Sequence, residues 1–282
     1  MAQGLGTLRS VQIIDLSIPI SPSTAEPDPP CIDYVDHHHA AHELAAVATR
    51  LLAQAAPPSA APTVITESAF QEGLGLANEN LRLDTHAGTH MDAPWHFGPL
   101  CENKPAKTID QIPLAWCFGP GVVLDLRHKR AGTLITPSDL EQALGHIGYA
   151  LQPNDIVLLM TGADKHVQQP DYFSAHAGMG REATLWLLDQ GIRVIGIDGW
   201  GFDRPAGAML QDYLRTGDCA ALLPAHMVGR DREYCHIEKM ANLDKIPVAY
   251  GFWVVCFPIK VERGSAGWVR AVALVGGGPE CA

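Results

Sequence analysis

Short runs of β-branched and aliphatic residues alternate along the chain with amphipathic segments. This pattern predicts strands at residues 11–18, 64–70, 81–85, 121–126, 156–161, 194–198, 248–261 and 268–275. Helices are predicted between them at TPSDLEQALGHIG, where Thr136 can act as the N-cap, and at REATLWLLDQG, which Gly191 ends. Because strands and helices intermix without a strict βαβ repeat, we expect an α/β fold with a mixed sheet flanked by helices.

The segment at residues 21–63 has a different composition from the rest of the chain. Proline-rich turns enclose a His-His-His run at 37–39 and an alanine-rich stretch whose apolar positions recur at helical spacing (Leu44, Val47, Leu51, Leu52). We therefore expect one domain over residues 1–282 that carries a helical insertion at about 21–63. The three consecutive histidines are expected to be solvated or to cap a helix.

Charge and composition exclude several classes of partner. Hydrophobic residues make up 47% of the 282 residues and charged residues 18%, which is typical of a globular protein. Lys and Arg total 20 against 31 Asp and Glu, so the formal charge of −11 disfavours nucleic acid and anionic membranes. The longest apolar stretch, at 246–259, is broken by two prolines and is shorter than the roughly 20 residues of a membrane span.

The cysteines and the N-terminal segment indicate the compartment. The seven cysteines are scattered and form no CxxC pair, which argues against a disulfide framework and against a cysteine zinc site. The first twenty residues lack the uninterrupted apolar core of a secretory signal. We expect a cytoplasmic protein.

Four potential metal ligands lie within eleven positions of LDTHAGTHMDAPWHF: His86, His90, Asp92 and His96. The spacing of the first two histidines matches an HExxH zinc helix, but Ala87 takes the place of the catalytic glutamate, and the glycine and proline of this stretch disfavour a helix. A strand ending in a tight loop is the better interpretation. Imidazoles with a carboxylate suit Zn²⁺, Mn²⁺ or Fe²⁺.

Two later segments contain further polar candidates. His226 and Glu238 are twelve residues apart in AHMVGRDREYCHIEKMANLDKIP, with His236 between them. Taken alone, this spacing is also compatible with a surface carboxylate. In DGWGFDRP, Asp203 and Arg204 could form a surface ion pair.

The segment HAGTHMDAPWHF resembles the HxGTHxDxPxHF motif of the cyclase family of metal-dependent hydrolases, which includes bacterial kynurenine formamidase and isatin hydrolase. IEKMANLDKIP is similar to the later family segment IENLTNLDxLP, GIDGWGFD to its GID strand end, and LLMTGADKH to its RTG strand. The resemblance runs from about residue 80 to the C-terminus. The chain departs from the family pattern at Lys239, Met240 and Met160, which replace Asn, Leu and Arg.

The resemblance implies a cyclase-like fold of the swivelling β/β/α type and a divalent metal site. It implies Mn²⁺ or Zn²⁺, as one ion or two, with these residues as ligands: His86, His90, Asp92, His226 and Glu238. Asp92 is then the residue able to bridge two ions, and His96 is the general acid/base. Relatives are usually oligomeric, so a homodimer or homotetramer is expected.

These residues favour a hydrolase that cleaves the C–N bond of a small amide, formamide or lactam with metal-activated water and a histidine base. The alternative is a non-haem Fe(II) oxygenase that uses His90, Asp92 and His226, although this leaves the remaining candidates without a role. A non-catalytic metal-binding protein is the third hypothesis. The aromatic side chains of Trp95, Phe97 and Trp200 either form a pocket for an aromatic substrate or pack in the core.

Overall fold

The computed structural model describes residues 11–59 and 61–276. Cys281 and the first ten residues, which entered the sequence-based expectations, lie outside these ranges. The chain divides into two compact units, one formed by Met1–Pro29 with Asp84–Ala282 and the other by Pro30–Leu83. Among the described helices, none has the length and apolar character needed to cross a bilayer.

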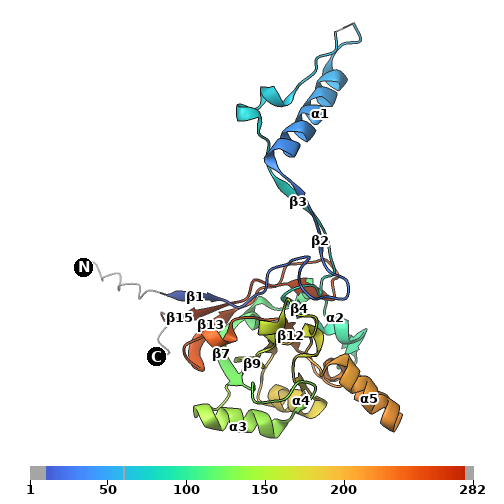
Figure 1. Cartoon of the computed structure of the whole chain (residues 1–282). Helices are drawn as coiled ribbons and strands as arrows, with labels where there is room; N and C mark the ends of the chain where they lie inside the picture. The colour runs from blue at the N-terminus through green and yellow to red at the C-terminus, as the bar shows by residue number, and fades with distance from the viewer. Residues whose placement is uncertain (1–10, 60, 277–282) are drawn as a thin grey trace, which may run out of the picture. The chain divides into compact units, whose positions relative to one another are not determined.

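A nine-stranded mixed sheet forms the centre of the larger unit (Figure 1). Its strands, in spatial order, are β1 (Gln12–Asp15), β15 (Val272–Val275), β13 (Tyr250–Val255), β7 (Phe118–Asp125), β9 (Ile156–Met160), β11 (Val194–Ile197), β12 (Cys235–Glu238), β4 (His90–Asp92) and β14 (Ala266–Trp268). The four strands from β7 to β12 are parallel and the outer pairings are antiparallel. The predicted α/β class with a mixed sheet is therefore confirmed.

Two helices pack on one face of this sheet. Helix α3 (Pro137–Ile147) begins at Thr136, whose side chain accepts a hydrogen bond from the Asp139 backbone N–H as predicted, and helix α4 (Arg181–Asp189) follows later in the chain. Their apolar side chains form one core cluster with alternate residues of the parallel strands, such as Val122 and Val157. The period-two alternation of strand side chains assigns the intervening residues to the other face.

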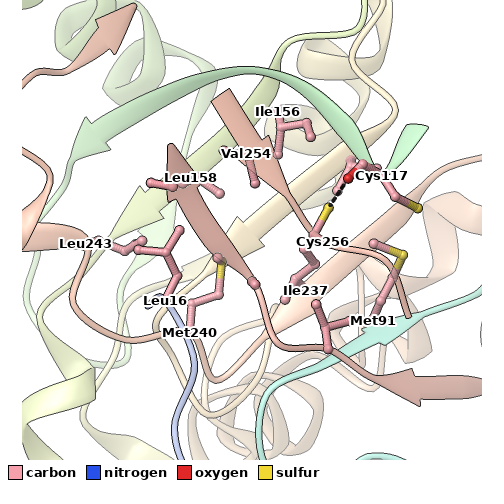
Figure 2. Packing of buried hydrophobic residues seen from close by; sticks show 14 of the residues in the cluster. Leu16, Met91, Cys117, Ile156, Leu158, Ile237, Met240, Leu243, Val254 and Cys256 are labelled. Carbon is pink, nitrogen blue, oxygen red and sulfur yellow. Dashed lines mark hydrogen bonds between the residues drawn. The ribbon is translucent and has the colours of Figure 1, made fainter. Parts of the chain in front are cut away.

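The opposite face of the sheet holds a second core cluster. It contains Val123, Leu158 and Ile237 from the strands together with side chains from the connecting segments. Figure 2 shows Leu16, Met91, Met240 and Leu243 converging here with Cys256, whose Sγ donates to the Cys117 carbonyl oxygen. Burial on both faces explains why the central strands are almost uniformly apolar in sequence.

The remaining α-helices and strands described in the larger unit are short or lie at its surface. They are α2 (Pro94–Phe97), α5 (Ala206–Thr216) and the two-residue strands β5 (Leu100–Cys101), β6 (Lys104–Pro105), β8 (Leu134–Ile135) and β10 (Gly178–Met179).

The smaller unit consists of a two-stranded ribbon and one long helix. Strands β2 (Cys31–Val35) and β3 (Asn78–Arg82) pair antiparallel. Helix α1 (His37–Ala55) begins at Asp36, whose side chain accepts from the His39 backbone N–H. The His-His-His run therefore forms the first turn of this helix.

Three predicted strands differ from the structure. The single strand expected at 268–275 is divided between β14 and β15, which lie in different parts of the sheet. Residues 64–70 form no strand but include a 3₁₀ turn at Glu67–Ala69, because an alternating pattern needs a partner strand and none pairs here among the described residues. The strand expected at 81–85 ends at Arg82, and the following loop contains a strand of its own, β4. Its three residues are too few to produce a periodic signal.

Candidate metal centre

Strands β4 and β12 lie side by side in the sheet and bring four polar side chains together (Figure 1). Asp92 is paired with His236, and His90 with Glu238, in antiparallel register. Because residues two apart in a strand point to the same face, these four side chains form a block on one face of the sheet. His236 is also level with Ile195 of β11, which places the block on the face that packs against the helices.

His86 and His96 reach this block from the two ends of the short strand. The Asp84 side chain and carbonyl accept from the backbone N–H groups of His86 and Ala87, and Gly88 continues the turn with a φ of 63°. The Nδ1 atom of His86 lies 2.9 Å from Asp92 Oδ1. His96, in helix α2, places Nε2 3.7 Å from Asp92 Oδ2 and is 33% exposed.

His226 comes from a more distant part of the chain and is held by Asp203. It begins a 3₁₀ turn, His226–Arg230, and its Nε2 lies 3.6 Å from Glu238 Oε1 and 3.8 Å from Asp92 Oδ2. Asp203 accepts from the backbone N–H groups of Ala225 and His226 and approaches His226 Nδ1 at 2.5 Å. An acceptor at Nδ1 directs the Nε2 lone pair toward the site, as is common for metal-binding histidines.

The two oxygens of each carboxylate face different histidines. Asp92 Oδ1 faces His86 Nδ1 at 2.9 Å and His90 Nε2 at 3.3 Å. Asp92 Oδ2 faces His236 Nε2 at 2.9 Å. Glu238 follows the same division, with Oε2 3.6 Å from His90 Nε2 and Oε1 3.3 Å from His236 Nε2. Two groups of donor atoms therefore share the carboxylates between them.

The donor atoms at this point suit a divalent cation. His90 Nε2, His236 Nε2 and both Asp92 oxygens are buried without an aligned hydrogen-bond partner, although they approach one another closely. Two geometric groups of potential ligands result, one of Asp92, His226, His236 and Glu238 and the other of His86, Asp92 and His96. A cation between these buried imidazoles and carboxylates would bind the lone pairs that no hydrogen bond satisfies.

The pKa shifts of these groups also indicate that the two carboxylates favour positive charge beside them. Burial raises the pKa of Asp92, but the surrounding histidines outweigh it and hold the pKa well below its usual range. Burial lowers the pKa of His236, but the negative charges of the Asp92 and Glu238 carboxylates beside its Nε2 atom raise it to about 9. Burial also lowers the pKa of His96, to about 4, because this histidine gains less from the carboxylates. Protons or a metal ion can supply the charge.

A cavity of about 360 Å³ opens beside the donors and is lined by His86, His96, His176, Trp200, His226 and Glu238, among others. This volume is in the range of small-molecule sites. Trp200 donates its indole N–H to Glu26, at 3.0 Å. Lys239 Nζ donates to both Glu26 oxygens, at 2.6 and 2.8 Å, and to the His86 carbonyl oxygen, at 2.8 Å. The lysine that departs from the family pattern thus lies in the cavity wall.

The other candidate aromatic residues lie outside this lining. Phe97 is 1% exposed and stacks on Tyr234, with ring centroids 5.1 Å apart, whereas Trp95 is 44% exposed. The surface ion pair considered for Asp203 and Arg204 is wrong, because Asp203 is buried against His226 and Arg204 pairs with Asp212.

Three features of the site were not among the sequence-based candidates: His236, Asp203 as the partner of His226, and the Glu26–Lys239 pair. The two-residue spacing of His236 and Glu238 in an apolar strand was a usable signal for the first. No local signal links Glu26 to Lys239, which are 213 residues apart.

Known proteins resemble this chain in sequence and in structure. The kynurenine formamidase of Salinibacter ruber is 27% identical over 193 residues, covering 68% of this chain and 77% of that protein. The isatin hydrolase of Roseibium aggregatum is 28% identical over 203 residues, covering 68% and 73%. An isatin hydrolase crystallised with the product analogue thioisatinate aligns over 94% of this chain and 92% of that one, with a TM-score of 0.69 and 22% identity.

A family model places these similarities in one group. The model described as "Putative cyclase" matches residues 14–204, which include the His86–His96 segment and end before His226. The match covers more than half of the chain and begins well before residue 80, where the motif resemblance starts. On this evidence the chain belongs to the cyclase family.

Proposed function

We propose that this protein is a metal-dependent hydrolase that cleaves the C–N bond of a small amide, formamide or lactam. The observation that carries the proposal is the convergence of the five expected ligands, His86, His90, Asp92, His226 and Glu238, beside a small-molecule cavity. The named relatives, a kynurenine formamidase and an isatin hydrolase, support the substrate class.

The donor set suits Mn²⁺ or Zn²⁺, as one ion or two, with Asp92 able to serve both donor groups. When bound, such an ion supplies Lewis acidity toward a carbonyl oxygen and lowers the pKa of water. The protein's own contribution is to fix the donors, since Asp203 and the Gly88 carbonyl hold the outer nitrogens of His226 and His90.

We assign His96 as the general acid/base. Its imidazole is one-third exposed, lines the cavity and lies at the edge of the donor atoms. From this position it can accept a proton from an attacking water and deliver it to the leaving nitrogen. Trp200 lines the same cavity in a fixed orientation, because its indole donates to Glu26, and this supports an aromatic substrate.

The test is a hydrolysis assay under anaerobic conditions. The metal-loaded protein is incubated with N-formylkynurenine, isatin and an aliphatic formamide, with the Asp92→Asn variant as the control. We expect turnover of at least one aromatic amide or lactam, and none by the variant. Turnover that occurs only in a parallel aerobic assay would replace the hydrolase with an oxygenase, and bound metal without turnover in either assay would indicate a non-catalytic member of the family.

The cytoplasmic location and the homodimeric or homotetrameric state remain predictions. Light scattering of the purified protein measures the oligomeric state directly.

A further inference from the structure

His236 is fully enclosed in the centre, as are His90 and Asp92. The His236 ring packs against two phenylalanines. Phe202 stacks on it with ring centroids 4.3 Å apart and an angle of 16°, and Phe97 lies 5.2 Å away on a tilt of 34°. Rings held in this way cannot change rotamer without disturbing the core. The direction of the His236 nitrogens is therefore determined by packing.

Tyr234 determines which His236 nitrogen carries the proton. The Tyr234 hydroxyl lies 3.0 Å from the Ala225 carbonyl oxygen, which can only accept, so the hydroxyl donates there. The same hydroxyl oxygen lies 3.3 Å from His236 Nδ1 and is left to accept from it. With the proton on Nδ1, the lone pair of the neutral imidazole is on Nε2.

The His236 Nε2 atom faces two carboxylate oxygens, Asp92 Oδ2 at 2.9 Å and Glu238 Oε1 at 3.3 Å. Neither contact has the alignment of a hydrogen bond, and Glu238 Oε1 already accepts from the Phe202 backbone N–H at 2.7 Å. A nitrogen lone pair directed toward two carboxylates is repelled unless a cation lies between them.

We propose that His236 is a metal ligand in this protein, joining His226, Asp92 and Glu238 around one ion, and that Tyr234 positions its imidazole for this role. The proposal rests on the metal site of the proposed function and adds to its ligand set. The four donors form one of the two groups found by geometry. Nitrogen and oxygen donors of this kind would suit zinc, and four of them are typical of an ion that is held tightly.

The test measures zinc affinity without turnover. Apoprotein, prepared with a chelator, is titrated with Zn²⁺ in competition with a chromophoric chelator. We expect His236→Gln to raise the Kd of the more tightly bound zinc about 100-fold or more. This exceeds the roughly 10–100-fold that is typical of residues that only orient a ligand. X-ray absorption of the zinc-loaded proteins should show one imidazole fewer per tightly bound zinc in the variant.

Two further variants separate ligation from general damage. Ile237→Val alters the neighbouring buried residue on the other face of β12 and should leave the zinc Kd within about threefold of the wild-type value. Tyr234→Phe keeps the aromatic packing and loses only the hydroxyl, and should raise the Kd about 10–100-fold. Circular dichroism of each apoprotein checks the fold, and if His236→Gln does not fold, Tyr234→Phe carries the test.

Several outcomes would overturn the proposal. An unchanged Kd and imidazole number in a folded His236→Gln protein would exclude ligation. Tighter zinc binding by that variant would show that His236 acts as a protonated counter-charge that competes with the metal. A normal affinity in Tyr234→Phe would remove the positioning role of Tyr234. If zinc binding depends on His236 but no substrate is hydrolysed, the proposed function fails and this inference stands.

Discussion

The chemistry of the centre depends on two buried carboxylates, Asp92 and Glu238. Both are enclosed by imidazoles, and each turns its two oxygens toward different histidines. Charges buried in this way need a compensating positive charge, because desolvation of a carboxylate costs several kcal/mol. The neighbouring Lys239 does not supply it, since its ammonium group is already bound by Glu26. The compensation therefore comes from imidazolium groups or from a metal.

Replacement of His96 tests its assignment as the general acid/base. His96→Ala is expected to keep its metal content and to lose about 10²–10⁴-fold in kcat, because proton transfer is removed while the buried donors remain. Metal analysis and steady-state kinetics measure the two quantities. His146→Ala, an exposed histidine on α3, is the matched control.

Two results would contradict this assignment. A fully active His96→Ala protein would exclude a role in proton transfer. A large loss of metal would instead identify His96 as a ligand, as its grouping with His86 and Asp92 permits.

At the scale of elements, strand pairing brings the donors together. The antiparallel register of β4 and β12 places Asp92 beside His236 and His90 beside Glu238. A shift of either strand by one residue would turn the donors of that strand to the opposite face, where Met91 and Ile237 now pack. The apolar residues between the donors thus maintain the register that the site requires.

Asp198 performs a structural task at the end of β11. Its Oδ1 accepts from the Thr161 N–H and hydroxyl, at 2.8 and 2.5 Å, and its Oδ2 accepts from the Gly162 N–H at 2.7 Å. Burial raises the pKa of Asp198 to about 6, although these hydrogen bonds oppose the rise. The side chain connects the ends of β9 and β11.

Asp198→Asn should change both stability and its pH dependence. The native state holds this proton up to about pH 6, whereas an unfolded Asp releases it near 3.8, so native protein binds more protons between these values. Stability therefore falls as the pH rises through this window, by up to about 3 kcal/mol from this group. The variant should lack this pH-dependent contribution. Its free energy of unfolding should also fall by about 1–3 kcal/mol, because the amide nitrogen cannot replace the second acceptor oxygen.

Urea unfolding of the chelator-treated proteins at pH 4.5, 5.5 and 6.5 measures this effect. The stability difference between wild type and variant should narrow as the pH rises. Asp171→Asn, at a side chain that is 58% exposed, is the control. Parallel stability profiles of wild type and Asp198→Asn would show that Asp198 does not titrate in this range.

At the scale of the whole molecule, metal binding and folding are linked. The ligands come from strands, a turn and a 3₁₀ segment that are far apart in the chain, so an unfolded chain does not present them together. An ion that binds only the native state stabilises it by about 2.7 kcal/mol at a concentration 100-fold above its Kd.

Removal of the metal should therefore lower the thermal midpoint. We expect the midpoint to fall by about 5–10 °C on chelation and to recover with Zn²⁺ or Mn²⁺. This value follows from the usual shift of the midpoint per kcal/mol and the binding free energy of about 2.7 kcal/mol. Differential scanning calorimetry measures it, and Asp92→Asn should respond little to either treatment. Equal midpoints for chelated and metal-loaded wild type would contradict a metal site built from these residues.

We propose that the unit at Pro30–Leu83, rather than the predicted segment at about 21–63, is an insertion into a cyclase domain. Cys31 and Arg82, near its ends, are direct partners in the β2–β3 ribbon, and neither core cluster of described residues includes a side chain from this unit. A variant with residues 31–82 replaced by a short Gly-Ser turn should fold and bind metal. Circular dichroism and metal titration test this expectation, and failure to fold would show that the segment is integral to the domain.

Sequence alone determined the features that depend on residues close together in the chain. HAGTHMDAPWHF concentrates His86, His90, Asp92 and His96 within eleven positions, and this density predicted both the family and the metal chemistry. The Thr136 cap predicted helix α3, and the short apolar runs predicted the central strands, because a cap and a run each involve residues only a few positions apart.

Tertiary structure alone decided which distant residues meet. His236 became part of the centre because β12 pairs with β4. Asp203 became the partner of His226 because the 23-residue segment that contains helix α5 returns to the same place. The Glu26–Lys239 pair joins opposite ends of the chain in the cavity wall. Such contacts depend on strand register and on close packing. Both are set by the complete fold, so they produce no pattern among neighbouring residues in the sequence.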